Sequence, residues 1–320
     1  MIGALAAALA LPACLRAQPA ARTYRMCWLS SGSGRGEKYN IAFVERLREL
    51  GFVENRNLVI DFRSAEGRVD RLPKLAAEAA RGKCDVFFAP GAEAVLAGAR
   101  QGSRDEPIVI VANDYDPVVT GHIGNLARPG GRLTGVSMLQ AELPAKRLEI
   151  LKEFVPQLKR IGVLADNSTK GQLARTQSAA DRIGVELIVH EFQQAPYDHE
   201  AAFARLAAGK AQAVLVLASG LFVPARQSIP RLALKHGLPS MFNNELWAEA
   251  GGLMSYGPDF PANYRRAADQ VARIFRGTKV GEIPFEQAPT VALVINLRSA
   301  KALGVDIAPA ALVRVDRVIE

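Results

Sequence analysis

The sequence predicts an α/β protein built from two doubly wound, parallel-sheet lobes, and three observations lead to this fold class. The first is the length of 320 residues, which is long for a single hydrophobic core. The second is a regular alternation of strand-length apolar runs with helical patterns. The third is that this alternation begins again halfway along the chain. The composition, 49% hydrophobic and 22% charged, is that of an ordinary globular protein.

The first half of the chain contains four buried-strand patterns separated by helical patterns. The predicted strands are Arg25–Leu29, Leu58–Phe62, Val86–Ala89 and Ile108–Ala112. The predicted helices include Tyr39–Leu50, ended by Gly51, and Arg71–Arg81, ended by Gly82. Strands that alternate with helices in this way predict βαβ units around a buried parallel sheet.

The second half repeats the pattern. Leu158–Asp166 is a new first strand, Gly171–Ile183 is its helix, and Val185–Phe192 and Ala213–Ala218 are the next strands. The segments GKCDVFFAPG at Gly82 and GKAQAVLVLASG occupy the same place in each half. Each consists of a helix stop, a buried strand and a loop of small residues, so we expect two similar domains.

Every predicted strand ends in small or polar residues. These ends are Ser30–Gly34, Ala89–Glu93, Asn113–Asp116, Asp166–Thr169, Ser219–Gly220 and Phe242–Glu245. Ligands of doubly wound sheets bind beyond the carboxyl ends of the strands. Two sheets whose strand ends face each other would form an interdomain cleft, which is a common place for a small-molecule site.

The N-terminal segment MIGALAAALALPACLRAQPAA has the apolar core of an export signal and is too short to span a bilayer. We expect residues 1–23 to be an export segment, with a signal-peptidase site after Ala17. LPAC also resembles a lipobox, so lipidation of Cys14 stays open as the alternative. No Lys or Arg precedes the apolar run. A buried N-terminal helix is the less favoured interpretation, because the apolar pattern stops before Tyr24.

The net charge of +8 does not indicate a nucleic-acid partner, because Lys and Arg are dispersed among acidic residues along the whole chain. Cys27 and Cys84 are expected to be small buried thiols, and a disulfide between them stays open. The four histidines show no metal-ligand spacing with one another or with cysteine. We therefore expect no metal and no cofactor.

The glycine-rich loop LSSGSGRG could indicate a nucleotide site, but the spacing of its glycines does not fit one. Gly32, Gly34 and Gly36 are spaced GxGxG and not GxGxxG, and no GxxxxGK[ST] loop occurs in the chain. No GxSxG nucleophile elbow occurs either. Asp114 and Asp116 are more typical of a helix cap or of a ligand contact than of acid–base catalysis. The pattern favours binding over catalysis, so we predict that the chain is not an enzyme.

Several separate motifs resemble the ABC-transporter substrate-binding family, some of whose members are tryptophan- or tyrosine-binding proteins. They are LRELGFVENRNLVIDFRSAEGRVDRLPKLAAEAARGKCDVFFAPG, DPV…LARPGGRLTGVS, KRLEILKEFVPQLKRIGVLAD, EAGGLMSYGPDF…YRRAADQVARI and LVINLRSAKALGV. The match runs from about Arg25 to Glu320. It implies a type I periplasmic-binding-protein fold and an exported receptor that closes on its ligand and presents it to a membrane permease.

The resemblance also implies three crossovers, near Ser137–Glu142, Tyr256–Asp259 and Glu286–Thr290. The lobes would then be residues 24–137 plus 257–286 and residues 138–256 plus 287–320. The helix Asn263–Arg276 would return to the first lobe, and the last segment would join the second.

The resemblance places the first-lobe ligand contacts in three loops. They are Ser30, Ser31, Gly32 and Ser33 after strand one, Pro90, Gly91, Ala92 and Glu93 after strand three, and Asn113, Asp114 and Asp116 after strand four. The family often reads G-T-x-A where this chain has Gly91-Ala92-Glu93-Ala94. The missing threonine hydroxyl and the added acid argue against a simple aromatic amino acid and permit a neutral or cationic ligand.

The second-lobe candidates are Asp166, Asn167, Ser219, Asn243, Asn244, Glu245 and Tyr256. Asp116 and Glu245 are also typical of helix caps. Trp247 and Phe222 stand at helical positions, which favours the core over ligand stacking.

We therefore expect a periplasmic, monomeric receptor that binds an amino-acid-like or aromatic solute and delivers it to the permease of an ABC importer. Three alternatives stay open. One is a cytoplasmic α/β enzyme that acts on a nucleotide or sugar, another is a ligand-sensing transcription regulator, and the third is a receptor that serves a sensor kinase.

Overall fold

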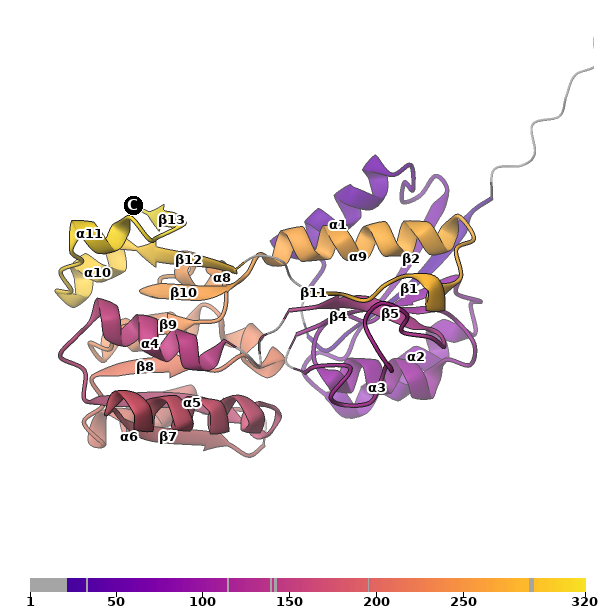
Figure 1. Ribbon diagram of the computed structural model, residues 1–320. Helices are drawn as coiled ribbons and strands as arrows, with labels where there is room; N and C mark the ends of the chain where they lie inside the picture. Colours follow the sequence, from indigo (N-terminus) through magenta and orange to yellow (C-terminus); the bar gives the residue numbers. More distant parts are fainter. Residues whose placement is uncertain are drawn as a thin grey trace, which may run out of the picture.

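The computed structural model describes residues 22–32, 34–113, 115–138, 140, 143–194, 196–287 and 291–320. These residues form two α/β lobes side by side, each with its own twisted sheet (Figure 1). The predicted fold class is confirmed: both sheets are dominated by parallel strands, and helices alternate with the strands along the chain.

The first sheet has the strand order β11-β5-β4-β3-β1-β2, and all its pairs are parallel. Its strands are β1 (Tyr24–Ser30), β2 (Leu58–Ser64), β3 (Val86–Phe88), β4 (Ile108–Ala112), β5 (Leu133–Ser137) and β11 (Glu286–Gln287). Its helical elements are α1 (Lys38–Glu49), η1 (Val69–Arg71), α2 (Leu72–Ala80), α3 (Glu93–Gly102), α9 (Phe260–Phe275) and η4 (Val280–Glu282).

Helices cover both faces of this sheet, which is why its central strands are continuous apolar runs. Successive side chains of a strand point to opposite faces. Met26 and Trp28 accordingly pack in one core with α1 and α9, whereas Cys27 and Leu29 pack in another with α2 and α3. Figure 1 shows α9 running over the first sheet on the side of α1, with α2 and α3 on the other side.

The second sheet has the order β13-β12-β10-β9-β8-β6-β7, and its β10–β12 pair is antiparallel. Its strands are β6 (Arg160–Asp166), β7 (Glu186–Phe192), β8 (Ala213–Val216), β9 (Ser240–Phe242), β10 (Met254–Pro258), β12 (Val291–Asn296) and β13 (Arg317–Ile319). Its helical elements are α4 (Pro144–Phe154), η2 (Asn167–Thr169), α5 (Lys170–Ile183), α6 (His199–Ala208), η3 (Gly220–Ala225), α7 (Ser228–Lys235), α8 (Glu245–Glu249), α10 (Leu297–Leu303) and α11 (Pro309–Leu312).

The chain passes between the sheets after β5, after β10 and after β11. The fully buried Arg147 of α4 joins the first two crossovers, because it donates to the Tyr256 carbonyl at 2.7 Å and to the Gln140 side chain. Gln140 in turn donates to the Asn243 carbonyl at 3.3 Å. Residues 139, 141, 142 and 288–290, which belong to the predicted crossovers, lie outside the described residues.

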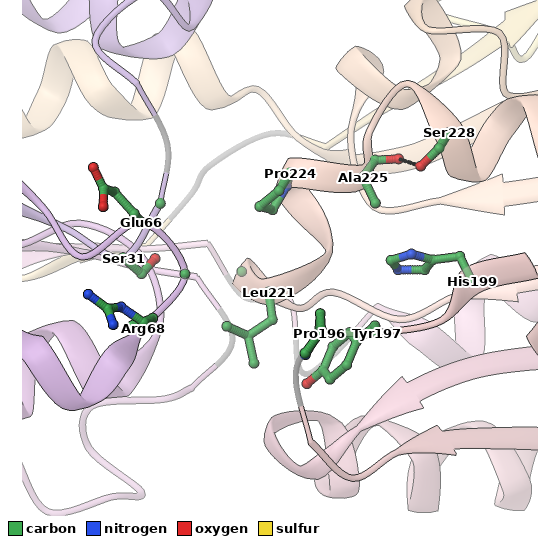
Figure 2. Close-up of a pocket in the computed structure, with 13 residues that line it drawn as sticks. Ser31, Glu66, Arg68, Pro196, Tyr197, His199, Leu221, Pro224, Ala225 and Ser228 are labelled. Atoms are coloured by element: carbon green, nitrogen blue, oxygen red, sulfur yellow. Dashed lines mark hydrogen bonds between the residues drawn. The ribbon is translucent and has the colours of Figure 1, made fainter.

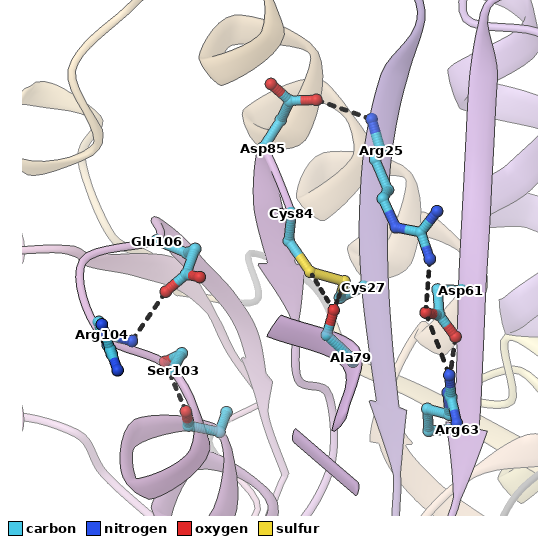
Figure 3. The surroundings of a disulfide bond; sticks show 11 residues. Arg25, Cys27, Asp61, Arg63, Ala79, Cys84, Asp85, Ser103, Arg104 and Glu106 are labelled. Carbon is cyan, nitrogen blue, oxygen red and sulfur yellow. Dashed lines mark hydrogen bonds and ion pairs between the residues drawn. A yellow bond between two sulfur atoms is a disulfide. The ribbon is translucent and has the colours of Figure 1, made fainter. Parts of the chain in front are cut away.

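Cys27 and Cys84 form a disulfide that joins β1 to the segment before β3, with a Cα–Cα distance of 5.7 Å (Figure 3). The expectation of two separate buried thiols was therefore wrong. The spacing of 57 residues could not decide the question, because the two cysteines approach each other only when β1 pairs with β3.

Within the described part of the chain, no helix combines the length and the apolar character that a membrane span requires.

Candidate ligand-binding cleft

The loops that follow the strands of the two lobes meet across a cleft. The turn after β1 approaches η3 of the second lobe so closely that a Cβ built on Gly32 would lie 4.0 Å from Pro224 Cγ. The start of α3 approaches the same element, since a Cβ on Gly220 would lie 3.7 Å from Ala92 Cβ. At both places a methyl group added to the glycine would already be in contact with the other lobe, so small residues let the lobes approach closely.

Behind these contacts lie two small cavities of about 40 and 30 Å³, which we call the inner compartments. Both are lined by Tyr39, Asn113, Val223 and Phe260. The first adds Ser31, Pro90, Gly91, Val111, Gly220 and Tyr264. The second adds Ser219, Arg226, Asn243, Asn244, Leu246 and Trp247. The inner compartments therefore combine aromatic rings with amide and hydroxyl groups from both lobes.

A larger cavity of about 570 Å³, the outer cavity, adjoins the first inner compartment, and Ser31 and Gly220 line both. Figure 2 shows Glu66 and Arg68 on the side of the first lobe, opposite residues of the second lobe. The wall on the second-lobe side is mostly apolar and is formed by Pro196, Tyr197, Leu221, Pro224 and Ala225. The volume of the outer cavity lies in the usual range for small-molecule sites.

Asn113 is the predicted residue that lines both inner compartments. Its Oδ1 is buried and has no hydrogen-bond partner among the described residues. The neighbouring amides of the second lobe are partly engaged. Asn244 caps α8 by accepting from the Leu246 N–H at 3.1 Å, and its Nδ2 lies 3.4 Å from Asn243 Oδ1. Asn113 therefore offers a free acceptor at the centre of the cleft.

The predicted acid Glu93 is held at the outside of the cleft by His122. The Glu93 Oε1 lies 2.7 Å from His122 Nε2, and the His122 Nδ1 lies 3.0 Å from the Arg100 guanidinium. An arginine can only donate, so Nδ1 accepts and Nε2 carries the proton that is donated to Glu93. The Glu93 carboxylate therefore has a partner away from the inner compartments.

Two further acids have structural partners. Asp116 accepts from the Val118 N–H at 2.8 Å, which fixes the turn after Pro117. Glu245, in the first turn of α8, pairs with Arg317 at 2.7 Å. Neither residue lines the inner compartments or the outer cavity.

Asp166 is buried and organises the loops of the second lobe. It caps η2 by accepting from the Ser168 N–H at 2.9 Å, and it accepts from the hydroxyls of Ser219 and Tyr197. Burial, together with the nearby Asp166 carboxylate, raises the pKa of Tyr197 to about 12. Asp166 thereby orients Ser219 toward the inner compartments and Tyr197 toward the outer cavity.

Four other predicted residues line neither the inner compartments nor the outer cavity. Ser30 is buried at the end of β1, where its carbonyl accepts from Ala65 N–H at 2.9 Å. Asn167 donates to the Gln193 carbonyl at 3.2 Å, and the Tyr256 ring packs against the core of the second lobe. Ala92 caps α3 without a side-chain hydrogen bond. Ser33 and Asp114 lie outside the described residues.

Two ion pairs cross the cleft from the start of α1. Glu37 pairs with Arg226 of the second lobe, and the two side chains are only 20% and 23% exposed. Lys38 pairs with Glu249 of α8 at 2.6 Å. Hydrogen bonds from Lys38 and Arg317 hold the pKa of Glu249 below its usual value, although burial acts in the opposite direction. These pairs form only when the lobes are together.

The sequence reasoning missed the aromatic residues of the cleft, namely Tyr39, Phe260 and Tyr264. All three pack in the core cluster of the first lobe and also line the inner compartments. Trp247 was expected in the core. It stacks on Phe242 at 5.1 Å and also lines the second compartment. Tyr197 and Leu221 of the outer cavity were not predicted either, since Tyr197 stands on a loop and Leu221 in the short element η3, neither of which has a distinctive pattern.

Comparisons with known proteins agree on one family. The family described as "ABC transporter substrate binding protein" matches residues 31–319. A tyrosine-binding protein of Clostridioides difficile (strain R20291) is 26% identical over 274 residues, which cover 83% of this chain and 76% of that protein.

Two solved structures cover 93% of this chain and all of theirs. A conserved domain protein of Vibrio cholerae has a TM-score of 0.84 at 23% identity. An ABC domain from Streptococcus pneumonia in complex with L-Trp has a TM-score of 0.80 at 20% identity. These likenesses show the fold. Since the family consists of substrate-binding proteins, the prediction that the chain is not an enzyme is confirmed. The chain belongs to the ABC transporter substrate binding protein family.

Proposed function

We propose that this protein is the exported solute receptor of an ABC importer and that it closes on a small aromatic or amino-acid-like solute between its lobes. The observation that carries the proposal is the cleft itself. Two inner compartments and an outer cavity lie between the strand ends of both lobes and draw their walls from both. Doubly wound sheets bind ligands at this edge.

Closure follows from contacts that a ligand makes with both lobes at once. A ligand shifts an equilibrium between open and closed forms only by as much as it prefers one of them. Ser31 and Asn113 come from the first lobe, whereas Ser219 and Gly220 come from the second. A solute that touches both pairs is held only in the closed form, which is the form that the permease would receive.

Two observations support an aromatic solute. The inner compartments carry the rings of Tyr39, Phe260 and Tyr264, and the outer cavity carries that of Tyr197. Aromatic rings favour stacked or edge-on contacts with other rings. In addition, one relative is named a tyrosine-binding protein and one similar structure was solved with L-Trp.

We propose the contact residues from the positions of the predicted ones. Those that line the cavities are the ligand contacts: Ser31, Gly32, Pro90, Gly91, Asn113, Ser219, Asn243 and Asn244. The other described ones position these contacts through hydrogen bonds, packing, caps and ion pairs: Ser30, Ala92, Glu93, Asp116, Asp166, Asn167, Glu245 and Tyr256. The lobes are residues 24–137 plus 257–286 and residues 138–256 plus 287–320.

Export to the periplasm is supported by the apolar N-terminal segment and by the Cys27–Cys84 disulfide, because disulfides persist in oxidising compartments. We propose that residues 1–23 direct export, with cleavage after Ala17 or lipidation at Cys14, and that the mature protein is a monomer.

A thermal-shift screen tests the proposal. Protein from Gln18 onward is unfolded, stripped of ligand, refolded with its disulfide and screened against amino acids, purines, small aromatic solutes, NAD(P) and nucleotides. A ligand at about 100 times its Kd adds about 2.7 kcal/mol to the free energy of unfolding, which raises the Tm by several degrees. We expect such a shift with aromatic solutes. A rise in Tm with NAD(P) or nucleotides alone would instead favour the alternative of an α/β enzyme that acts on a nucleotide.

A further inference from the structure

The inner compartments are built from neutral polar groups. Their side-chain hydrogen-bonding groups include the amides of Asn113, Asn243 and Asn244 and the hydroxyl of Ser219. Among the described residues that line them, Arg226 is the single charged one, and its guanidinium is already paired with Glu37. A group that enters these compartments therefore meets amides, hydroxyls and aromatic rings.

Among the described residues, three acids of the loops around the inner compartments are held by partners within the protein and not left free for an ammonium group. Glu93 pairs with His122 at 2.7 Å, Glu245 pairs with Arg317 at 2.7 Å, and Asp166 accepts from Ser168, Ser219 and Tyr197. Each carboxylate is thus committed to a structural contact. A carboxylate head inside the inner compartments would fare no better with the described side chains, because Ala92 has no hydroxyl and both Arg226 and Lys38 are paired across the cleft. Arg68 lines the outer cavity and neither inner compartment.

A free amino acid would bring two opposite charges into this environment. A buried charge without a partner is strongly unfavourable, whereas a neutral amide is accommodated once its hydrogen bonds are satisfied. The Asn113 Oδ1 is a buried acceptor without a partner among the described residues, so it requires a donor. An amide group supplies a donor and an acceptor together and therefore complements an asparagine.

We infer that the solute recognised in this cleft is an aromatic compound whose polar head is uncharged and amide-like, and that Asn113 reads this head. The inference rests on the proposed function and narrows its ligand class. The head occupies the inner compartments beside Asn113. The aromatic body extends past Ser31 and Gly220 into the outer cavity, where Tyr197, Leu221 and Pro224 form an apolar wall.

Four indole compounds that differ in the charge of the head provide the test. Indole-3-acetamide is neutral, indole-3-acetate is an anion, tryptamine is a cation and L-tryptophan is a zwitterion. Calorimetric titration of the ligand-stripped protein is expected to show that indole-3-acetamide binds roughly 30-fold or more tightly than each charged compound, because each of them buries an unpaired charge. Tighter binding of L-tryptophan, tryptamine or indole-3-acetate would overturn the inference.

The same titrations separate this inference from the proposed function. If a charged indole binds best and the Tm rises accordingly, the receptor assignment stands and the neutral head is wrong. If none of the four compounds binds and the wide thermal-shift panel is also silent, the proposed function itself fails. A neutral heteroaromatic amide from that panel binding in place of the indoles would support the inference.

Asn113→Asp provides a matched change inside the cleft, since it adds one negative charge with almost no change of shape. We expect the ratio of tryptamine affinity to indole-3-acetamide affinity to rise at least about tenfold. Asn125→Asp is the control. Asn125 is exposed and its Oδ1 accepts from the Arg128 N–H, a role that an aspartate keeps. An unchanged ratio in a folded Asn113→Asp protein would show that Asn113 does not face the head.

Discussion

Two side chains, Glu37 and Arg226, form an ion pair between the lobes, and we expect this pair to favour the closed form. They belong to different lobes, and both are largely buried when they pair. A pair of this kind is made in the closed form and broken in the open form, so it contributes to the equilibrium between them. The neighbouring pair of Lys38 with Glu249 acts in the same sense, although the lysine is 59% exposed and its contribution is smaller.

Arg226→Gln should therefore weaken ligand binding. The Glu37 carboxylate would lose its partner in the closed form, at a cost of about 1–2 kcal/mol, which corresponds to roughly a 5- to 30-fold rise in Kd. Titration of the strongest stabiliser from the thermal-shift panel measures this change. Arg314→Gln is the matched control, because Arg314 pairs with Glu153 on the exposed surface of the second lobe. Equal Kd values for the two variants would show that the Glu37–Arg226 pair does not stabilise the closed form.

His190 and His199 predict how stability depends on pH. Burial is the main cause that lowers the pKa of each below its usual value of 6.5, so folding favours the neutral form of both rings. Below that pH the unfolded chain takes up protons more readily than the folded one, and the free energy of unfolding falls as the pH falls. The loss due to these groups stops once the folded histidines are protonated.

His199→Phe isolates one of them. His199 lies among the rings of Phe192, Tyr197 and Phe222, so a phenyl ring keeps the packing. Between about pH 7.5 and about pH 5.5, the Tm of the variant should fall less than that of the wild type. Scanning calorimetry at both pH values provides the measurement, and an identical fall in both proteins would contradict the assignment.

At the scale of the single residue, the sequence was sufficient to predict several polar residues of the cleft but not their hydrogen-bond and ion-pair partners. Asn113, Ser219, Asn243 and Asn244 were predicted as site residues because they follow buried strands, and all four line the inner compartments. The pairing of Glu93 with His122 depends on how the loop after β4 packs against α3, and no local pattern encodes it. The same holds for ion pairs whose members are about 190 or more residues apart.

At the scale of elements, the disulfide ties β1, an interior strand of the first sheet, to the segment that leads into its neighbour β3. Cys27→Ala together with Cys84→Ala should lower the free energy of unfolding by up to about 4 kcal/mol, since the bond closes a loop of 57 residues. Urea unfolding with and without reductant measures it. Reductant should lower the midpoint of the wild type and leave that of the double variant unchanged. A midpoint that does not differ between the oxidised wild type and the variant would contradict the prediction.

The second crossover depends on the absence of a side chain at Gly257, near the end of β10. A Cβ there would lie 1.8 Å from the Asn243 carbonyl oxygen and 3.5 Å from the Arg147 guanidinium. Gly257→Ala should therefore displace the loop that carries Asn243, destabilise the protein by about 1–3 kcal/mol and weaken ligand binding. Gly171→Ala on α5 is the control, because the added methyl group meets open space there. Gly277→Ala would not serve, because its φ of +95° is strained for any residue with a side chain. If Gly257→Ala has the stability and the Kd of the wild type, the prediction is wrong.

Element boundaries followed the local patterns closely and departed from them at the cleft. The helix expected at Asn263–Arg276 begins earlier, at Phe260, because Asp259 caps it by accepting from the Ala262 N–H at 2.9 Å. The strand expected at Ala213–Ala218 ends at Val216. Its last residues turn into the cleft loop, where the Ala218 N–H and carbonyl bond to the buried Gln172 side chain.

At the scale of the whole molecule, the repeated alternation of strands and helices was sufficient to predict two α/β sheets. The crossovers were placed from family resemblance and not from periodicity, because a crossover is a short connection without a period of its own. The cavities could not be predicted at all. Their size depends on how closely Gly32, Gly220 and Ala92 let the lobes approach, and this is a property of the assembled structure.

The measurement that tests the central claim most directly is small-angle X-ray scattering of the ligand-stripped protein, with and without the strongest stabiliser from the thermal-shift panel. We predict that the ligand-free protein has a larger radius of gyration than the present structure, and that saturating ligand reduces it to the value of this structure. A ligand that binds, by calorimetry, and leaves the radius of gyration unchanged would contradict closure between the lobes.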